Sequence, residues 1–152
     1  MTSPIEKLRE FGYELPAPKA PVASYVPVNR SGNLLYVSGQ LSSNDQGVVT
    51  GRLGENMNVV QGGNAAELAA LNILSQIVHG AGVPLEDIKR IVKITVLVAS
   101  TPEFTEQHLV ANGCSNMLVA VLGDKGKHAR AAFGVASLPF GAAVEIEAVV
   151  EV

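Results

Sequence analysis

Two opposite charges stand among small and apolar residues near the end of the chain, in the stretch HARAAFGVASLPFGAAVEIEAVVEV. Arg130 has alanine on both sides, at positions 129 and 131. These small neighbours leave room for a planar guanidinium to bind a carboxylate through two parallel hydrogen bonds. The alternative is an arginine held by a local ion pair at the start of a strand. The sequence leaves both interpretations open.

Glu145 is the second charge, and it lies between two apolar residues of a strand pattern. A carboxylate in such a place costs free energy unless it is paired, exposed or used in chemistry. Glu147 falls on the same face of that strand, and repulsion between the two can raise the pKa of one of them. A carboxyl group with a raised pKa suits the handling of a proton or of a water molecule. The simpler alternative is a strand face open to solvent.

Three further residues could line a binding site. In YVSGQL, Gly39 follows Ser38 inside a strand pattern, where a glycine allows a ligand or another backbone to approach closely. Tyr25, in SYVP, would place a phenol on the neighbouring strand of a hairpin. A β-bulge at the glycine and a half-buried core tyrosine are the alternatives for these positions.

The sequence lacks the residues that several other kinds of chemistry need. Cys114 is the only cysteine, which excludes a disulfide framework, and we interpret it as a small core or interface residue. The histidines at 79, 108 and 128 do not have metal-ligand spacing. The stretch QGGNAAEL lacks the lysine of a phosphate loop, and no G-x-S-x-G hydrolase motif is present. We therefore expect neither a metal nor a cofactor.

Length and composition bound the class of protein. We expect one domain over 1–152, with an N-terminal helix and Pro-rich lead-in over 1–22. Because 47% of the residues are hydrophobic and only 16% are charged, a subunit of an oligomer fits better than a monomer. A net charge of -3 and a single small basic cluster argue against nucleic acid as a partner. Without a membrane span or signal peptide, the expected location is the cytoplasm.

The expected elements form an α+β order. A short helix around 5–11 and the Pro-rich 14–23 precede a hairpin of strands within 24–30 and 33–41. A Gly-rich stretch over 44–57 holds one short strand near 48, and helical spacing over 58–81 predicts the strongest helix. A strand over 91–98 is expected to be buried on both faces, because it is almost continuously apolar.

The remaining elements complete the order ββαβαββ. Thr101, with Pro102 and Glu103 behind it, predicts the start of a second long helix that ends at Gly123 and is interrupted at Gly113. The final stretch, 128–152, is expected to form a hairpin, which would put Arg130 and Glu145 on adjacent strands. Two long helices then cover one face of a mixed sheet, and the other face needs a partner.

At this point the residues resemble a known family. The chain from 25 to 152 is similar to the YjgF/RidA family, also called reactive intermediate deaminases and L-PSP endoribonucleases. The likeness rests on YVSGQL, IVKITVLVAS, VANG and above all ARAAFGVASLPFGAAVEIEA, in which an arginine strand, a Leu-Pro turn and an apolar-Glu-apolar strand follow one another. Arg130, Leu138, Pro139 and Glu145 fall on those positions.

The resemblance implies a chorismate-mutase-like fold and a homotrimer with a ligand pocket at each subunit interface. It implies that Arg130 binds the carboxylate of a small substrate, that Glu145 positions a water molecule, and that Tyr25, Ser38, Gly39 and Ala132 line the pocket. His128 stands where family members often have proline or alanine, and Ala132 where many have cysteine. These departures bear on the identity of the substrate rather than on the fold.

The resulting hypothesis is hydrolysis of a 2-imino acid to a 2-oxo acid and ammonia, with enamines entering through their imine tautomers. Arg130 would bind the carboxylate while Glu145 orients the attacking water. A protein that binds a small carboxylate without catalysis is the alternative, because it too needs Arg130. A ribonuclease or translation inhibitor fits the older family name, but the acidic balance and the absence of a histidine pair or a basic stripe argue against it.

Overall fold

The computed structural model describes residues 2–18 and 23–152, and its elements follow the predicted α+β order. The longer elements are α1 (Pro4–Glu10), β1 (Val28–Ser31), β2 (Leu34–Leu41), α2 (Val59–Ser75), β5 (Arg90–Ala99), α3 (Gln107–Leu122), β6 (Ala129–Val135) and β7 (Val144–Glu151). The shorter elements are β3 (Ser43–Asn44), β4 (Gly47–Val48), a π-helical turn at Gln76–Gly80, and 3₁₀ turns at Leu85–Asp87, Gly123–Gly126 and Pro139–Gly141. The predicted first helix, first hairpin and short strand near 48 are thus confirmed. Part of the Pro-rich stretch, 19–22, lies outside the described residues.

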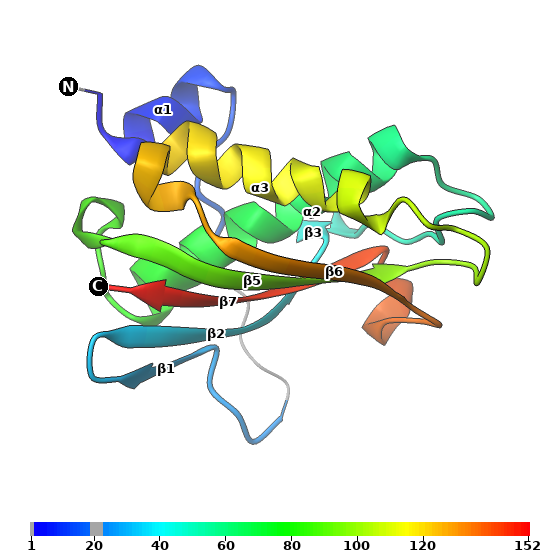
Figure 1. Cartoon of the computed structure of the whole chain (residues 1–152). Coiled ribbons are helices and arrows are strands. Elements are labelled where there is room, and N and C mark those ends of the chain that lie inside the picture. The colour runs from blue at the N-terminus through cyan, green and yellow to red at the C-terminus, as the bar shows by residue number, and fades with distance from the viewer. Residues whose placement is uncertain (1, 19–22) are drawn as a thin grey trace.

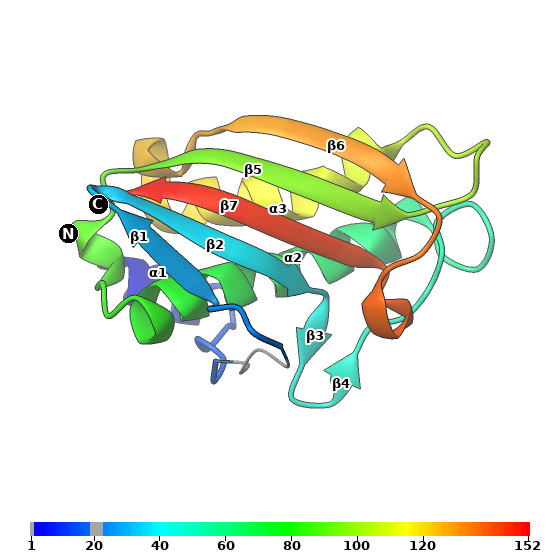
Figure 2. The ribbon, with the colours of Figure 1, turned by 90° about the horizontal axis from the view of Figure 1, so that it is seen from below.

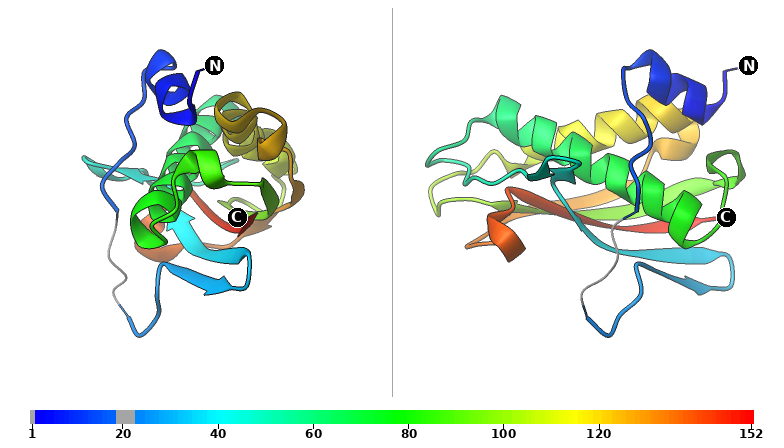
Figure 3. Two further views of the ribbon diagram at one scale, coloured as in Figure 1. Left: turned by 90° about the vertical axis from the view of Figure 1, so that its left-hand side faces the viewer. Right: turned by 180° about the vertical axis from the view of Figure 1, so that it is seen from behind.

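One five-stranded sheet carries the fold, in the order β1-β2-β7-β5-β6 (Figure 2). Its strand pairs are antiparallel except for β5 and β6, which run parallel. The helices α2 and α3 cover one face of this sheet (Figure 1). The small helix α1 packs against α3 on the far side of the helical layer from the sheet (Figure 3). The predicted mixed sheet with two long helices on one face is confirmed.

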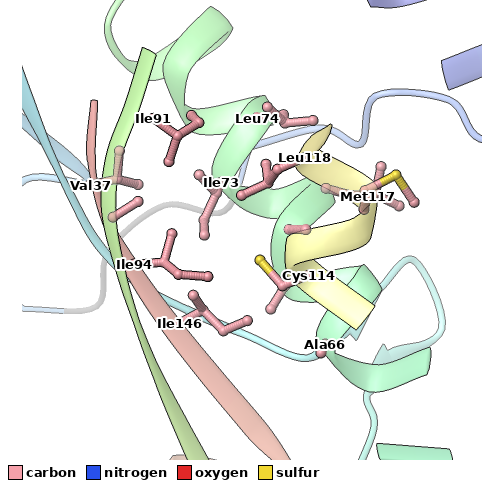
Figure 4. Packing of buried hydrophobic residues seen from close by; sticks show 14 of the residues in the cluster. Val37, Ala66, Ile73, Leu74, Ile91, Ile94, Cys114, Met117, Leu118 and Ile146 are labelled. Carbon is pink, nitrogen blue, oxygen red and sulfur yellow. The ribbon is translucent and has the colours of Figure 1, made fainter. Parts of the chain in front are cut away.

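The core lies between the helices and the sheet. Every second residue of β7 faces the helices and is buried: Val144, Ile146, Ala148 and Val150. They meet apolar side chains of α2, α3 and β5, among them Ile73, Ile94 and Leu118 (Figure 4). Each buried aliphatic side chain stabilises the fold by about 1.5–3 kcal/mol, so this layer fixes which face of each strand points outward.

The two long helices begin and pack for identifiable reasons. Asn58 and Gln61 form a capping box at the start of α2, each side chain accepting a hydrogen bond from the other's backbone N–H at 2.9 Å. Contrary to prediction, Gly113 does not interrupt α3. A Cβ at 113 would lie 2.0 Å from the carbonyl oxygen of Gly63. The glycine is therefore needed because the backbones of α2 and α3 touch there.

The predicted start of α3, with Thr101 as its cap, is wrong by five residues, because Glu106 holds the cap position. The N–H of Thr101 donates to the carbonyl oxygen of Leu53 at 3.0 Å, and the N–H of Phe104 donates back to the carbonyl of Thr101 at 3.2 Å. The Thr-Pro-Glu signal therefore forms a turn docked on the preceding loop, and α3 begins only at Gln107. A tertiary contact that the sequence does not reveal overrides the local signal for a helix start.

The final hairpin is also wrong. β6 pairs with β5, whereas β7 pairs with β2 on one side and β5 on the other. The connection between β6 and β7 leaves the sheet through the turn at Pro139–Gly141, where Phe140 has a positive φ of 59°. The residues of β7 that face the helices are fully buried, as befits a central strand, and those of β6 are mostly small and exposed, as befits an edge.

The second face of the sheet is not covered by any described residue. β5 alternates, with Ile94 and Val96 buried under the helices and Thr95 and Leu97 half-exposed on the other face. The prediction that this strand is buried on both faces is therefore wrong for the single chain. The apolar residues that prompted it remain open to a further partner.

Candidate active site

Arg130 lies on the edge strand β6, opposite Ile94 of β5, and so points to the helical side of the sheet. Its Nη1 donates to Oδ1 of Asn112 at 2.9 Å and to Oγ of Ser115 at 3.1 Å, and its Nη2 donates to the carbonyl oxygen of His108 at 3.3 Å. None of its partners is a carboxylate, so the alternative of a local ion pair is wrong. An Nε–H and one Nη2–H remain without a partner among the described residues. These two nitrogens share one edge of the guanidinium, the arrangement that receives a carboxylate.

Glu145 lies on β7, opposite Leu97, and points to the open face of the sheet. Partial burial is the main cause that raises the pKa of its carboxyl above the usual value, and the charge of Glu147 raises it further. No hydrogen bond or ion pair from the described residues compensates this carboxylate. A half-buried, unpaired carboxylate is costly, and such a cost is typical of groups kept for binding or proton transfer.

The backbone of Gly39 lies close to the carboxylate of Glu145. The pairing of β2 with β7 shifts register between Val37 and Gln40, so Ser38 and Gly39 form a β-bulge. A Cβ on Gly39 would lie 2.4 Å from Oε1 of Glu145 and 3.0 Å from its Cδ. Its φ is not in the left-handed region, so the glycine matters here for the space that it leaves to the carboxylate rather than for its backbone conformation.

Ser38 ties the chain before β1 to this bulge. Its N–H donates to the carbonyl oxygen of Pro27 at 2.9 Å, and its hydroxyl donates to that of Val26 at 2.8 Å. Tyr25 directly precedes this contact and is 51% exposed. It lies in a bend rather than on the strand that the sequence predicted. The two residues are nevertheless brought to the same end of β2.

Ala132 lies two residues beyond Arg130 on the same side of β6, opposite Val96. As an edge strand, β6 has a row of backbone N–H and C=O groups without a strand partner among the described residues. Arg130 and Ala132 therefore form one group at the sheet edge. Ser38, Gly39 and Glu145 form a second group, at the end of β2.

The two groups do not meet within one chain. β5 lies between β6 and β7, which puts the two strands about 10 Å apart at the usual strand spacing. Arg130 also points to the helical side and Glu145 to the open side. The expectation that these side chains stand on adjacent strands is wrong, because it rested on the hairpin that does not form.

Sequence reasoning missed the residues that hold Arg130. Asn112 and Ser115 follow His108 at positions i+4 and i+7, so all three share one face of α3. This spacing of polar residues on an otherwise apolar helix was a signal that could have found them. His128, whose role the sequence left open, lies behind this group, with its Nε2 2.8 Å from Oγ of Ser115.

Other candidate sites receive less support. Cys114 is fully buried, and burial raises the pKa of its thiol to about 12, in keeping with a core residue. Across residues 2–18 and 23–152, no three side chains of His, Cys, Asp or Glu gather in a way that could hold a metal ion. In the same residues, no helix is long and apolar enough to cross a bilayer.

Comparison with known proteins places this chain in a family. The family model described as Endoribonuclease L-PSP matches residues 16–152. The chain belongs to the YjgF/RidA family. Its sheet, with two long helices on one face, is the chorismate-mutase-like fold of these proteins.

Three similar proteins illustrate the likeness. Protein TCP17 of Trypanosoma cruzi is 49% identical over 95% of this chain and 91% of its own length. The mouse 2-iminobutanoate/2-iminopropanoate deaminase is 34% identical over 88% of this chain and 83% of its own. A crystal structure of a protein of unknown function from Agrobacterium tumefaciens matches with a TM-score of 0.92 and 50% identity, covering 98% of this chain and 92% of that one.

Proposed function

We propose that this chain is a 2-imino acid deaminase, which hydrolyses a small 2-imino acid to a 2-oxo acid and ammonia. The observation that carries the proposal is a pair of opposite charges whose binding capacity is unused. Among the described residues, an Nε–H and one Nη2–H of Arg130 have no partner, and neither has the carboxylate of Glu145, whose pKa is raised. The similarity to the mouse deaminase supports the same reaction.

We further propose that the chain works as a homotrimer, in which Arg130 of one copy faces Glu145 of the next. Support comes from the geometry of the single chain, where the two side chains point to opposite faces of the sheet. The open face also carries half-exposed Leu97 and the 47% exposed rings of Tyr36 and Phe133. A second copy would bury this apolar surface and the free edge of β6.

In the proposed reaction, Arg130 binds the substrate carboxylate and draws electron density from the imine carbon. Glu145 accepts a proton from a water molecule as its oxygen attacks that carbon, and the C=N electron pair moves to nitrogen. The proton passes on to the nitrogen, which gives an amino alcohol. The proton of its hydroxyl group then moves to the amino group, so that the C–N bond breaks and a C=O bond forms as ammonia leaves. Imine and water thus give oxo acid and ammonia.

The surroundings of Glu145 suit this role. Burial and Glu147 shift the pKa of the carboxyl group towards neutral pH. A group accepts and returns a proton most readily when its pKa lies near the working pH. Backbone groups near Gly39 and Ala132 would hold the nitrogen and the tetrahedral centre. Because an imine carbon is already electrophilic, the proposed steps use no cofactor.

The test generates the imine in situ with an amino-acid oxidase and follows formation of oxo acid and ammonia. Wild type is expected to accelerate the hydrolysis, and Arg130→Ala is expected to lose on the order of 100-fold in kcat/KM, because a misplaced substrate loses its alignment with the water. Arg30→Ala is the matched control, since Arg30 is also exposed but lies on β1, at the opposite edge of the sheet.

Two outcomes would overturn the proposal. Binding of a 2-oxo acid without any acceleration of hydrolysis would make the chain a small-carboxylate-binding protein. Cleavage of a labelled RNA that survives repurification and disappears in Arg130→Ala would instead favour the ribonuclease of the family description.

A further inference from the structure

A chain of hydrogen bonds runs behind Arg130, away from its free edge. Oγ of Ser115 lies at its centre, 3.1 Å from Nη1 of Arg130 and 2.8 Å from Nε2 of His128. The other ring nitrogen of His128, Nδ1, lies 2.6 Å from the carbonyl oxygen of Gly126. Asn112 adds a second acceptor for Nη1 at 2.9 Å.

The chemistry of these groups sets the direction of every bond. The carbonyl oxygen of Gly126 can only accept, so Nδ1 of His128 carries a proton and donates it. In the neutral ring Nε2 is then the acceptor, and the hydroxyl of Ser115 must donate to it. This orients a lone pair of Oγ towards Arg130, whose Nη1 can only donate.

The end of this hydrogen-bond chain at Gly126 is itself fixed in place. Gly126 is buried, and a Cβ there would lie 2.2 Å from the carbonyl oxygen of Leu118 in α3. The turn at Gly123–Gly126 therefore packs directly on the backbone of α3. His128 and Ser115 are consequently held by one rigid unit, and the tautomer of the ring follows from the fold.

We infer that Ser115 and His128 are positioning residues, which together with Asn112 hold the guanidinium of Arg130 so that its Nε and Nη2 edge faces a substrate carboxylate. The inference rests on the proposed function. An exposed arginine samples many rotamers, and immobilising one on binding weakens affinity. Three acceptors on α3 already hold Arg130 in the free protein, so less freedom is lost when the carboxylate binds.

The experiment measures the affinity of wild type and variants for 2-oxobutanoate by NMR titration, together with kcat and KM for the imine. Ser115→Ala is expected to weaken binding roughly three- to tenfold, as expected for one exposed hydrogen bond to a charged group. KM should rise while kcat changes little, because the lost contact is made equally in the ground and transition states. Ser115→Thr keeps the hydroxyl and should restore most of the affinity.

A double-mutant cycle separates positioning from general damage. His128 acts on Arg130 only through Ser115, so adding His128→Ala to Ser115→Ala should change the affinity by less than about twofold. Asn116→Ala is the control, because Asn116 is the exposed neighbour of Ser115 on α3. The ¹⁵N shifts of the His128 ring should show the proton on Nδ1.

The outcomes distinguish this inference from the proposed function. If Arg130→Ala binds the oxo acid as well as wild type does, the proposed function fails. If Arg130→Ala loses binding but Ser115→Ala does not, only the positioning role is overturned. Equal losses in Ser115→Ala and Ser115→Thr, additive losses in the double variant, or a proton on Nε2 would overturn it as well.

Discussion

Gly39→Ala offers a sharp test of the role of Glu145, because it moves the carboxylate without changing its chemistry. The new Cβ would lie 2.4 Å from Oε1 and 3.0 Å from Cδ of Glu145. Contacts between nonbonded carbon and oxygen atoms settle beyond about 3.3 Å, so the carboxylate must move by roughly 1 Å. A displacement of this size in a catalytic group costs on the order of 100-fold in rate.

Stability should change far less than activity. The atoms that meet the new Cβ belong to the end of a flexible, half-exposed side chain, which can swing away. We expect a loss of no more than about 1 kcal/mol in the free energy of unfolding. The assay pairs kcat for the imine with urea denaturation of the same preparation.

Gly63→Ala is the matched control for this substitution. A Cβ at 63 meets nothing within 4 Å, and inside α2 it should stabilise by about 0.5–1 kcal/mol. Wild-type kcat in folded Gly39→Ala would refute the role of Glu145. An equal loss in both variants would show that the assay reports general damage.

Two further predictions concern packing and pH. Gly113→Ala should lower the free energy of unfolding by about 3 kcal/mol or more, because its Cβ would lie 2.0 Å from the backbone of α2. Urea denaturation measures the loss. An unchanged denaturation midpoint would contradict the close helix contact. Glu147→Gln should lower the pKa of Glu145 and move the acid limb of the kcat profile to lower pH. The raised pKa means that ionised Glu145 destabilises the folded state, so this variant should be more stable than wild type at neutral pH. The difference in the free energy of unfolding should disappear as the pH falls through the pKa of Glu145. A difference that stays constant down to acid pH would contradict the coupling.

The parts of the fold that follow from local pattern could be predicted from the sequence. The alternation of Val144, Ile146, Ala148 and Val150 fixed the buried face of β7, and the spacing of apolar residues fixed α2. The partner of β7 could not be predicted, because alternation defines a face but does not choose between neighbouring strands. Thr101 shows the same limit, since its capping signal was overridden by a hydrogen bond to Leu53.

For the same reason, the residues of the candidate site could be predicted but their relative placement could not. Residue type pointed to Arg130 and Glu145, and the bulge at Gly39 was foreseen as an alternative. Their separation depends on β5 lying between their strands, and the sequence carries no signal for this strand order. The contact between Gly39 and Glu145 arises from the register of β2 against β7, which only the structure provides.

The most direct measurement mixes two inactive variants, Arg130→Ala and Glu145→Gln, after unfolding and refolding them together. If each site takes its arginine from one copy and its glutamate from the next, random mixing leaves about a quarter of the sites intact, since each half is present with a chance of about one in two. The account predicts recovery of about a quarter of wild-type deaminase activity. Mixtures that stay as inactive as either variant alone, while co-refolded wild type regains full activity, would contradict it.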